Sequence, residues 1–118
     1  MNNITIIPIK NLPEFSPKQD LADELIKGFE NNNIALEDND VIVVTQKIVS
    51  KVENRLIENN FVNIEELIEK ESLEILRKRG DTIIARTKHG FICANAGIDK
   101  SNIKKGSVLL LPEDPDKT

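Results

Sequence analysis

Two stretches of the chain carry side chains that could bind charged ligands. In the first, an apolar run at residues 41–44 ends abruptly and polar residues follow at once: Thr45, Gln46, Lys47, Ser50 and Lys51. Lys47 and Lys51 are four positions apart, so a helical turn would place both ammonium groups on one side. Like charges side by side repel, and an anion between them reverses the sign of that interaction. The pattern predicts an anion-facing edge of a site.

The second stretch, residues 89–102, also passes from an apolar run into small and polar residues. Asp99, Ser101 and Asn102 offer oxygen donors, which suit Mg²⁺ or Mn²⁺. Asn95 and Gly97 permit close backbone approach. The same residue types are ordinary turn formers, and on residue type alone the turn is favoured over a metal ligand. Both interpretations stay open at this point.

Other reactive or charged residues have simpler explanations. His89 stands beside a glycine in a hairpin-length connection, where a surface or packing role is expected. Cys93 lies in an apolar run with no thiolate partner in sequence, which indicates a buried structural thiol. The basic residues 77–79 precede Gly80, and the dipole at the end of a helix explains them without a ligand. Residues 112–118 form an acidic, proline-broken tail.

Composition limits the class of protein. A chain of 118 residues is expected to form a single domain, 1–118. Its net charge of −4 and isoelectric point near 5.1 argue against general nucleic-acid binding, which needs a basic surface. One cysteine, no apolar run of membrane-spanning length and no signal-peptide pattern lead us to expect a cytoplasmic protein that binds no membrane.

The periodicity of apolar residues predicts the elements that would position these side chains. Helices are expected from Ser16 to about Glu30, opened by a capping box, and from Asn63 to just before Gly80. Strands are expected at residues 4–9, 41–44, 82–86, 91–94 and 107–111. This order predicts an α/β (α+β) fold with a mixed β-sheet and two to three helices. It does not support a doubly wound fold, because clean βαβ crossovers are missing.

Three stretches of the sequence carry a resemblance to a known family. Residues 41–51, 89–102 and 109–116 resemble, in order, three signatures of the coenzyme F420-0:L-glutamate ligase (γ-glutamyl ligase) family. The resemblance runs along essentially the whole chain. It implies a GTP-dependent and divalent-metal-dependent ligase that joins L-glutamate to a deazaflavin coenzyme precursor through an acyl phosphate. It also implies a homodimer with a mixed α/β fold.

The resemblance assigns roles residue by residue. Asp99 matches a ligand of Mg²⁺ or Mn²⁺, which favours the metal interpretation of that residue over the turn. It identifies no catalytic side chain, and Asn11 stands where the family usually has glycine. The positions that match nucleotide contacts are Leu12, Pro13, Glu14, Phe15, Gln46, Lys47, Lys51 and Asn102.

The length of the chain departs from the family pattern. Family members are about twice as long, and further acidic metal ligands follow the last signature. We therefore expect these residues to be the N-terminal portion of a longer ligase and expect the isolated chain to be inactive. Two alternatives stay open. One is a non-catalytic nucleotide-binding or dimerisation module derived from the family, and the other is a related ligase with a different carboxylate substrate.

Overall fold

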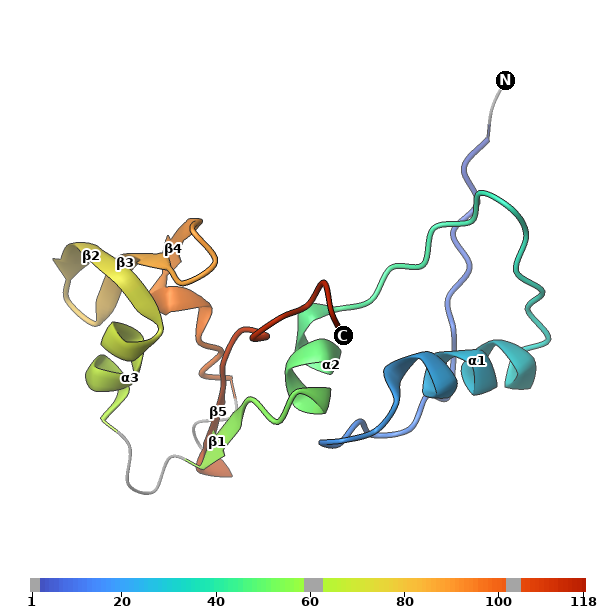
Figure 1. Ribbon diagram of the computed structural model, residues 1–118, viewed down its shortest axis with the longest axis horizontal. Helices are drawn as coiled ribbons and strands as arrows, with labels where there is room; N and C mark the ends of the chain where they lie inside the picture. Colours follow the sequence, from blue (N-terminus) through green and yellow to red (C-terminus); the bar gives the residue numbers. More distant parts are fainter. Residues whose placement is uncertain (1–2, 59–62, 102–104) are drawn as a thin grey trace.

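A computed structural model describes residues 3–58, 63–101 and 105–118. Figure 1 shows the helices and strands of these ranges along the chain. In chain order, the elements are α1 (Leu21–Asn31), α2 (Gln46–Val52), β1 (Leu56–Glu58), α3 (Ile64–Lys70), β2 (Ser72–Arg79), β3 (Thr82–Thr87), β4 (Ile92–Ala94), a 3₁₀ helix (Asn95–Gly97) and β5 (Ser107–Leu109).

The described strands form two antiparallel sheets. β1 pairs with β5, and β2, β3 and β4 form a three-stranded sheet in that order. An α+β fold with two to three helices is thus confirmed. The described strands pair only in the antiparallel sense, in two sheets, where the sequence predicted a single mixed sheet.

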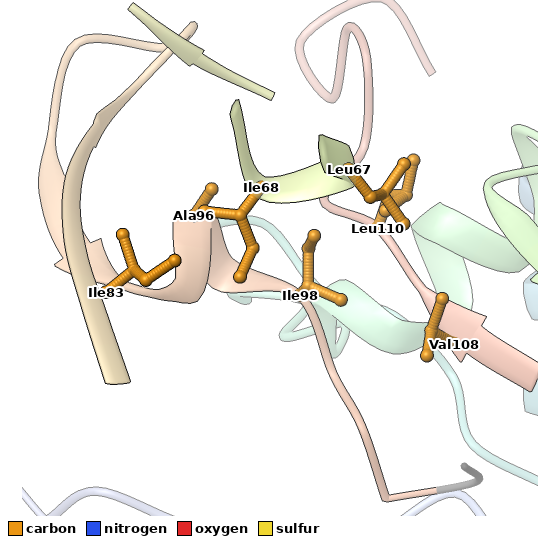
Figure 2. Packing of buried hydrophobic residues seen from close by; sticks show 7 residues of the cluster. All are labelled: Leu67, Ile68, Ile83, Ala96, Ile98, Val108 and Leu110. Carbon is orange, nitrogen blue, oxygen red and sulfur yellow. The ribbon is translucent and has the colours of Figure 1, made fainter. Parts of the chain in front are cut away.

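The hydrophobic core lies between α3, β3 and the chain that leads from the 3₁₀ helix through β5. Figure 2 shows its seven buried side chains, which come from these elements and interlock between them: Leu67, Ile68, Ile83, Ala96, Ile98, Val108 and Leu110. Directly after β5, Leu110 N–H donates to the carbonyl of Arg55, which lies between α2 and β1, at 3.0 Å. The core therefore holds the strand on which α2 rests.

The other end of the molecule has little core of its own. Figure 1 shows α1 and the N-terminal segment at one end, α3 with β2, β3 and β4 at the other, and α2 between them. The Cα radius of gyration is 17.2 Å, against about 13.5 Å for a compact chain of this length. Within residues 3–45, the buried positions are Phe15, Gly28 and Phe29. The N-terminal third is thus attached to the fold over a small area.

The strands predicted at residues 4–9 and 41–44 are wrong. Both segments lie outside helices and strands. Ile4 and Ile6 are 93% and 88% exposed, and Val41 and Val43 are 84% and 88% exposed. β-branched residues favour a strand only when a neighbouring strand pairs with it, and none of the described strands does so here.

The first helix begins five residues later than predicted, at Leu21. Lys18 has φ +68°, which interrupts a helical backbone, and Asp20 caps the helix by accepting a hydrogen bond from Asp23 N–H. One half of the predicted capping box does form, because Gln19 Oε1 accepts from Ser16 N–H at 2.7 Å. It closes a turn ahead of the helix.

The long helix predicted from Asn63 to Gly80 is correct only in its first half. Asn63 caps α3 as expected, accepting from Glu65 N–H at 3.0 Å, but the helix ends at Lys70. Residues 72–79 form β2, which pairs with β3. The helix-dipole explanation of the basic residues 77–79 is therefore wrong, because they lie on a strand.

The remaining strands are confirmed with small changes at their ends. β3, β4 and β5 lie where strands were predicted at residues 82–86, 91–94 and 107–111. Gly90 N–H donates to the Thr87 carbonyl at 2.9 Å and closes the predicted hairpin connection. At the end of the chain, Thr118 donates to a Glu53 carboxylate oxygen at 2.6 Å. No helix in the described ranges combines the length and apolar character needed to cross a membrane.

Candidate functional site

The helix α2 carries three of the residues that the sequence singled out. Thr45 is its N-cap residue, and Gln46, Lys47 and Lys51 follow on the helix itself. Gln46 Nε2 donates to Ser50 Oγ at 2.6 Å and reaches the Leu110 carbonyl at 3.4 Å. Gln46 therefore ties α2 to the end of β5 and leaves the two lysines to present their charges.

Backbone pairing brings Asp99 to the same place. Asp99 N–H donates to the Leu109 carbonyl at 2.8 Å, and Leu109 N–H donates back to the Asp99 carbonyl at 3.1 Å. β5 thus supports α2 and Asp99 together, and Lys47 Nζ lies 2.9 Å from Asp99 Oδ2. The two stretches singled out in the sequence meet at one ion pair, between residues that are 52 positions apart along the chain.

Asp99 is held in its ionised form. The hydrogen bond from Lys47, followed by that from the Ser101 N–H at 2.8 Å, lowers the pKa of the Asp99 carboxyl to about 2. Hydrogen bonds to the charged form of a carboxylate stabilise it. At neutral pH Asp99 presents a full negative charge, which is what a metal ligand requires.

A second ion pair joins the segment before α1 to α2. Glu14 and Lys51 form a salt bridge, and this contact lowers the pKa of the Glu14 carboxyl. Lys18 N–H donates to the Val52 carbonyl at 3.2 Å, at the end of the same helix. Two elements that are separated by more than 30 residues of chain therefore face each other across one opening.

Contacts with α1 hold the loop that carries Glu14. Asn32, at the end of α1, accepts from Lys10 N–H at 3.1 Å and donates to the Lys10 carbonyl at 2.9 Å. Leu12 packs so closely on Gly28 that a Cβ there would lie 2.6 Å from Leu12 Cδ2. The helix thus fixes the loop through both its backbone and a side chain.

Between the loop and α2 lies a pocket of about 550 Å³. Its lining comes from the loop, α2 and the β1–β5 sheet: Glu14, Phe15, Ser16, Pro17, Lys47, Lys51, Leu56, Lys105 and Ser107. Three lysines face one carboxylate, although the chain as a whole has a net charge of −4. The pocket therefore concentrates positive charge on an acidic protein, which favours an anion.

The structure brings some of the predicted site residues into this pocket and places others beside it. Glu14, Phe15, Lys47 and Lys51 line it. Leu12 is used to anchor the loop, Gln46 is hydrogen-bonded within the fold, and Pro13 is absent from the lining. Asp99 lies next to the pocket through its ion pair with Lys47. The prediction for Asn102 falls outside the described residues.

Sequence reasoning missed five lining residues: Ser16, Pro17, Leu56, Lys105 and Ser107. The Ser-Pro pair was interpreted only as a helix start, and the turn that it forms instead exposes it to the pocket. Lys105 and Ser107 follow the Asp99 stretch closely, so their proximity in sequence was the available signal. Leu56 carried no signal, because a lone leucine is more often a core residue.

The site fits a metal ion that is shared with a bound phosphate. Within residues 3–58, 63–101 and 105–118, no three His, Cys, Asp or Glu side chains cluster in a way that could hold a metal. Asp99 supplies one ionised carboxylate. Mg²⁺ is commonly held by one or two carboxylates together with substrate phosphates and water. A single carboxylate beside an anion pocket matches that pattern and does not match an all-protein cage.

His89 and Cys93 lie outside this arrangement. The His89 ring stacks on Phe91 with 6.0 Å between centroids, which is a packing contact on the β3–β4 hairpin. Burial raises the pKa of the Cys93 thiol, so it stays protonated at neutral pH. Only the thiolate is a good nucleophile, so a structural role for Cys93 is favoured, although its side chain is partly buried where the sequence predicted a buried thiol.

Comparisons with known proteins match most of the chain to one family of ligases. The family model for F420-0:Gamma-glutamyl ligase matches residues 10–118. The coenzyme F420:L-glutamate ligase of Methanothermobacter thermautotrophicus is 35% identical, over 96% of this chain and 52% of that protein. The enzyme of the same name from Methanococcus maripaludis is 37% identical, over 80% of this chain and 47% of that protein. The enzyme of that name from Methanopyrus kandleri is 32% identical, over 98% of this chain and 50% of that protein.

The chain thus spans about half the length of the curated relatives that it matches. The match covers the loop with Glu14, the helix with Lys47 and Lys51, and the stretch with Asp99. From this match we conclude that the chain belongs to the F420-0:γ-glutamyl ligase family.

Proposed function

We propose that this chain supplies the nucleotide-binding and metal-binding part of a ligase that forms a γ-glutamyl amide bond between L-glutamate and a deazaflavin coenzyme precursor. GTP would be the co-substrate and Mg²⁺ or Mn²⁺ the cation. The observation that carries the proposal is that Lys47 and Lys51 line one positively charged pocket while Asp99 is paired with Lys47 beside it. The match of the chain to a family of glutamate ligases supports the class of reaction.

The chemistry explains why such a pocket is needed. A carboxylate does not react with an amine in water, because oxide is a poor leaving group. The precursor carboxylate would attack the γ-phosphorus of GTP, giving an acyl phosphate and GDP. The glutamate amine would then attack the acyl carbon, releasing inorganic phosphate and a proton and forming the amide. Catalysis of phosphoryl transfer is mostly positioning and charge neutralisation.

The residues present would share this neutralisation. Lys47 and Lys51 would contact phosphate oxygens, and Lys105, which also lines the pocket, would add a third positive charge. Asp99 would hold a divalent cation whose role is to neutralise charge on the same phosphates. Phe15, which is 7% exposed, gives the pocket one rigid apolar wall.

We further propose that the isolated chain binds nucleotide and metal without ligating glutamate. One carboxylate cannot saturate a divalent cation, and the described residues contain no group of three or more His, Cys, Asp or Glu side chains that could hold one. The homodimer and the cytoplasmic location implied by the family resemblance belong to the same proposal.

Isothermal titration calorimetry with GTP, with and without Mn²⁺, tests this function. We expect binding that strengthens with metal, and we expect Lys51→Ala and Asp99→Ala to weaken GTP binding in the presence of Mn²⁺ by at least tenfold. Lys78→Ala is the matched control, because Lys78 also forms a salt bridge, with Glu65, far from the pocket. Equal binding by all four proteins would contradict the proposed site.

A second candidate function is a non-catalytic module that keeps the fold and binds nucleotide or another subunit. The small buried area of residues 3–45 favours it, since a module of this kind relies on a partner. Absence of any GTP binding in the calorimetry would favour this candidate over the ligase site. A related ligase with another carboxylate substrate would bind GTP and metal equally, and it differs only in the precursor that it accepts.

A further inference from the structure

Two apolar segments of the chain are largely exposed, and no strand within the described ranges pairs with either of them. We call residues 4–9 the first apolar segment and residues 41–44 the second apolar segment. Apart from Pro8, every residue of the two is β-branched. Ile4, Ile6, Val41 and Val43 are each at least 84% exposed. Exposed apolar patches of this kind mark interaction surfaces.

The backbone N–H and C=O groups of these segments also lack hydrogen-bond partners within the described residues. Among the described residues, no hydrogen bond joins a backbone group of either segment to the rest of the chain. The hydrogen bonds of the N-terminal segment start only at Lys10, which pairs with Asn32. A β-branched stretch with free N–H and C=O groups is a template for pairing with another strand. Only another polypeptide backbone satisfies both its polar groups and its side chains.

We propose that the two apolar segments are completed by strands from the polypeptide region that corresponds to the half of the relatives outside this match. The proposal holds whether that region is joined to this chain or is a separate subunit. The unmatched half of each curated relative is about as long as this chain, which is enough to supply several strands. Pro8 has no N–H, so the first segment should pair at a sheet edge or end its pairing there.

The position of the segments gives this pairing a consequence for the pocket. The first segment leads into the loop with Glu14, and the second leads directly into α2 with Lys47 and Lys51. Figure 1 shows the first segment at the N-terminal end of the molecule and the second leading from the α1 end into α2, both away from the sheet of β2, β3 and β4. Strand pairing there would brace the two walls of the pocket from outside.

Association in solution tests the proposal without any nucleotide, so its outcome is independent of the proposed function. The chain is mixed with a polypeptide made of the part of the Methanothermobacter thermautotrophicus ligase that this chain does not match. Size-exclusion chromatography with light scattering is expected to show a one-to-one complex. Hydrogen exchange of residues 4–9 and 41–44 is expected to slow at least tenfold on mixing.

Variants show whether the apolar segments carry the contact. Ile6→Lys and Val43→Lys should weaken association at least tenfold, and both side chains are 88% exposed, so the chain itself should fold. Leu73→Lys is the control, because Leu73 is 65% exposed on β2, and its association should stay within twofold of wild type. Association that all three variants leave unchanged would overturn the proposal.

Two further results would also overturn it. If the chain alone protects both segments as its concentration rises, a second copy of the chain is the occupant. The full-length Methanothermobacter relative provides a measurement that does not depend on a half-chain folding by itself. Fast hydrogen exchange in its stretches that align with residues 4–9 and 41–44 would show that no strand covers them, and slow exchange is expected.

Discussion

Lys47 Nζ lies 2.9 Å from Asp99 Oδ2, so the proposed phosphate-binding cation and the proposed metal ligand neutralise each other in this structure. A nucleotide that binds alone must take Lys47 away from Asp99, and a metal that binds alone must take Asp99 away from Lys47. When both bind, the broken ion pair is replaced by two new ones. Nucleotide and metal should therefore bind cooperatively, which is a reciprocal coupling between the two ligands.

Replacing Asp99 by asparagine should separate the competition of the ion pair with the nucleotide from the contribution of the metal. Asp99→Asn frees Lys47, so GTP binding without metal should strengthen by about threefold to tenfold, the range expected for losing one partly exposed competing ion pair. The same variant should lose most of the gain that Mn²⁺ gives to wild type. Calorimetry at constant ionic strength measures both. A variant that binds metal-free GTP more weakly than wild type would show that the ion pair does not compete with the nucleotide.

The salt bridge between Glu14 and Lys51 leads to a related expectation for anions. Among the described lining residues, Glu14 is the only carboxylate, and Glu14→Gln leaves Lys51 without its salt-bridge partner. Affinity for inorganic triphosphate should rise about threefold, and it should fall with added salt more steeply than in wild type. Fluorescence competition or calorimetry can measure this affinity at each salt concentration. Unchanged affinity would mean that Lys51 is not a phosphate contact.

The lowered pKa of Asp99 predicts a dependence of stability on pH. Its pKa is about 2 in the folded chain and about 3.9 when unfolded. The ionised carboxylate therefore stabilises the fold above pH 4, and this contribution disappears as the pH falls towards 2. Urea unfolding should show Asp99→Asn less stable than wild type by up to about 1 kcal/mol at pH 7. The difference should shrink towards zero at pH 2, and a difference independent of pH would exclude this ion pair as its source.

Gly97 is the backbone position on which the Asp99 stretch depends. It has φ +73°, and a Cβ there would lie 2.6 Å from Leu111 Cδ1. Gly97→Ala combines backbone strain with overpacking and should destabilise the chain by roughly 2–5 kcal/mol. Gly80→Ala is the matched control, because Gly80 has φ +56° but open space around it, and it should cost only about 1 kcal/mol. Equal losses in thermal or urea unfolding would show that the contact with Leu111 is unimportant.

The structure brings Lys47 and Asp99 together although several elements around them differ from the prediction. Lys47 and Lys51 were singled out because they follow an apolar run that ends abruptly, a pattern of residue types close in sequence. The same kind of pattern favoured a turn for Asp99, and only the family resemblance assigned it to a metal. The meeting of Lys47 and Asp99 depends on β5, whose pairing with Asp99 through Leu109 is a long-range contact that no local pattern specifies. The same limit hid Lys105 and Leu56, which reach the pocket only through the β1–β5 sheet.

The errors in the predicted helices and strands also arise because long-range pairing, and not local sequence, decides the structure. Residues 72–79 have helical spacing of apolar side chains, but antiparallel pairing of six of these residues with β3 outweighs that local preference. Residues 4–9 and 41–44 have strand composition, but a strand needs a partner, and none of the described strands pairs with them. The β3–β4 hairpin was predicted correctly because its turn and its strands are adjacent in sequence.

Paramagnetic broadening by Mn²⁺ tests most directly whether Lys47, Lys51 and Asp99 form one site for a metal and a nucleotide. Amide spectra of the ¹⁵N-labelled chain would be recorded with GTP and a small fraction of Mn²⁺. The account predicts that broadening is centred on Asp99 and Ser101, extends to Lys47 and Lys51, and disappears in Asp99→Ala. Broadening centred instead on Glu53 and Asp114, where acidic side chains gather at the end of the chain, would contradict it.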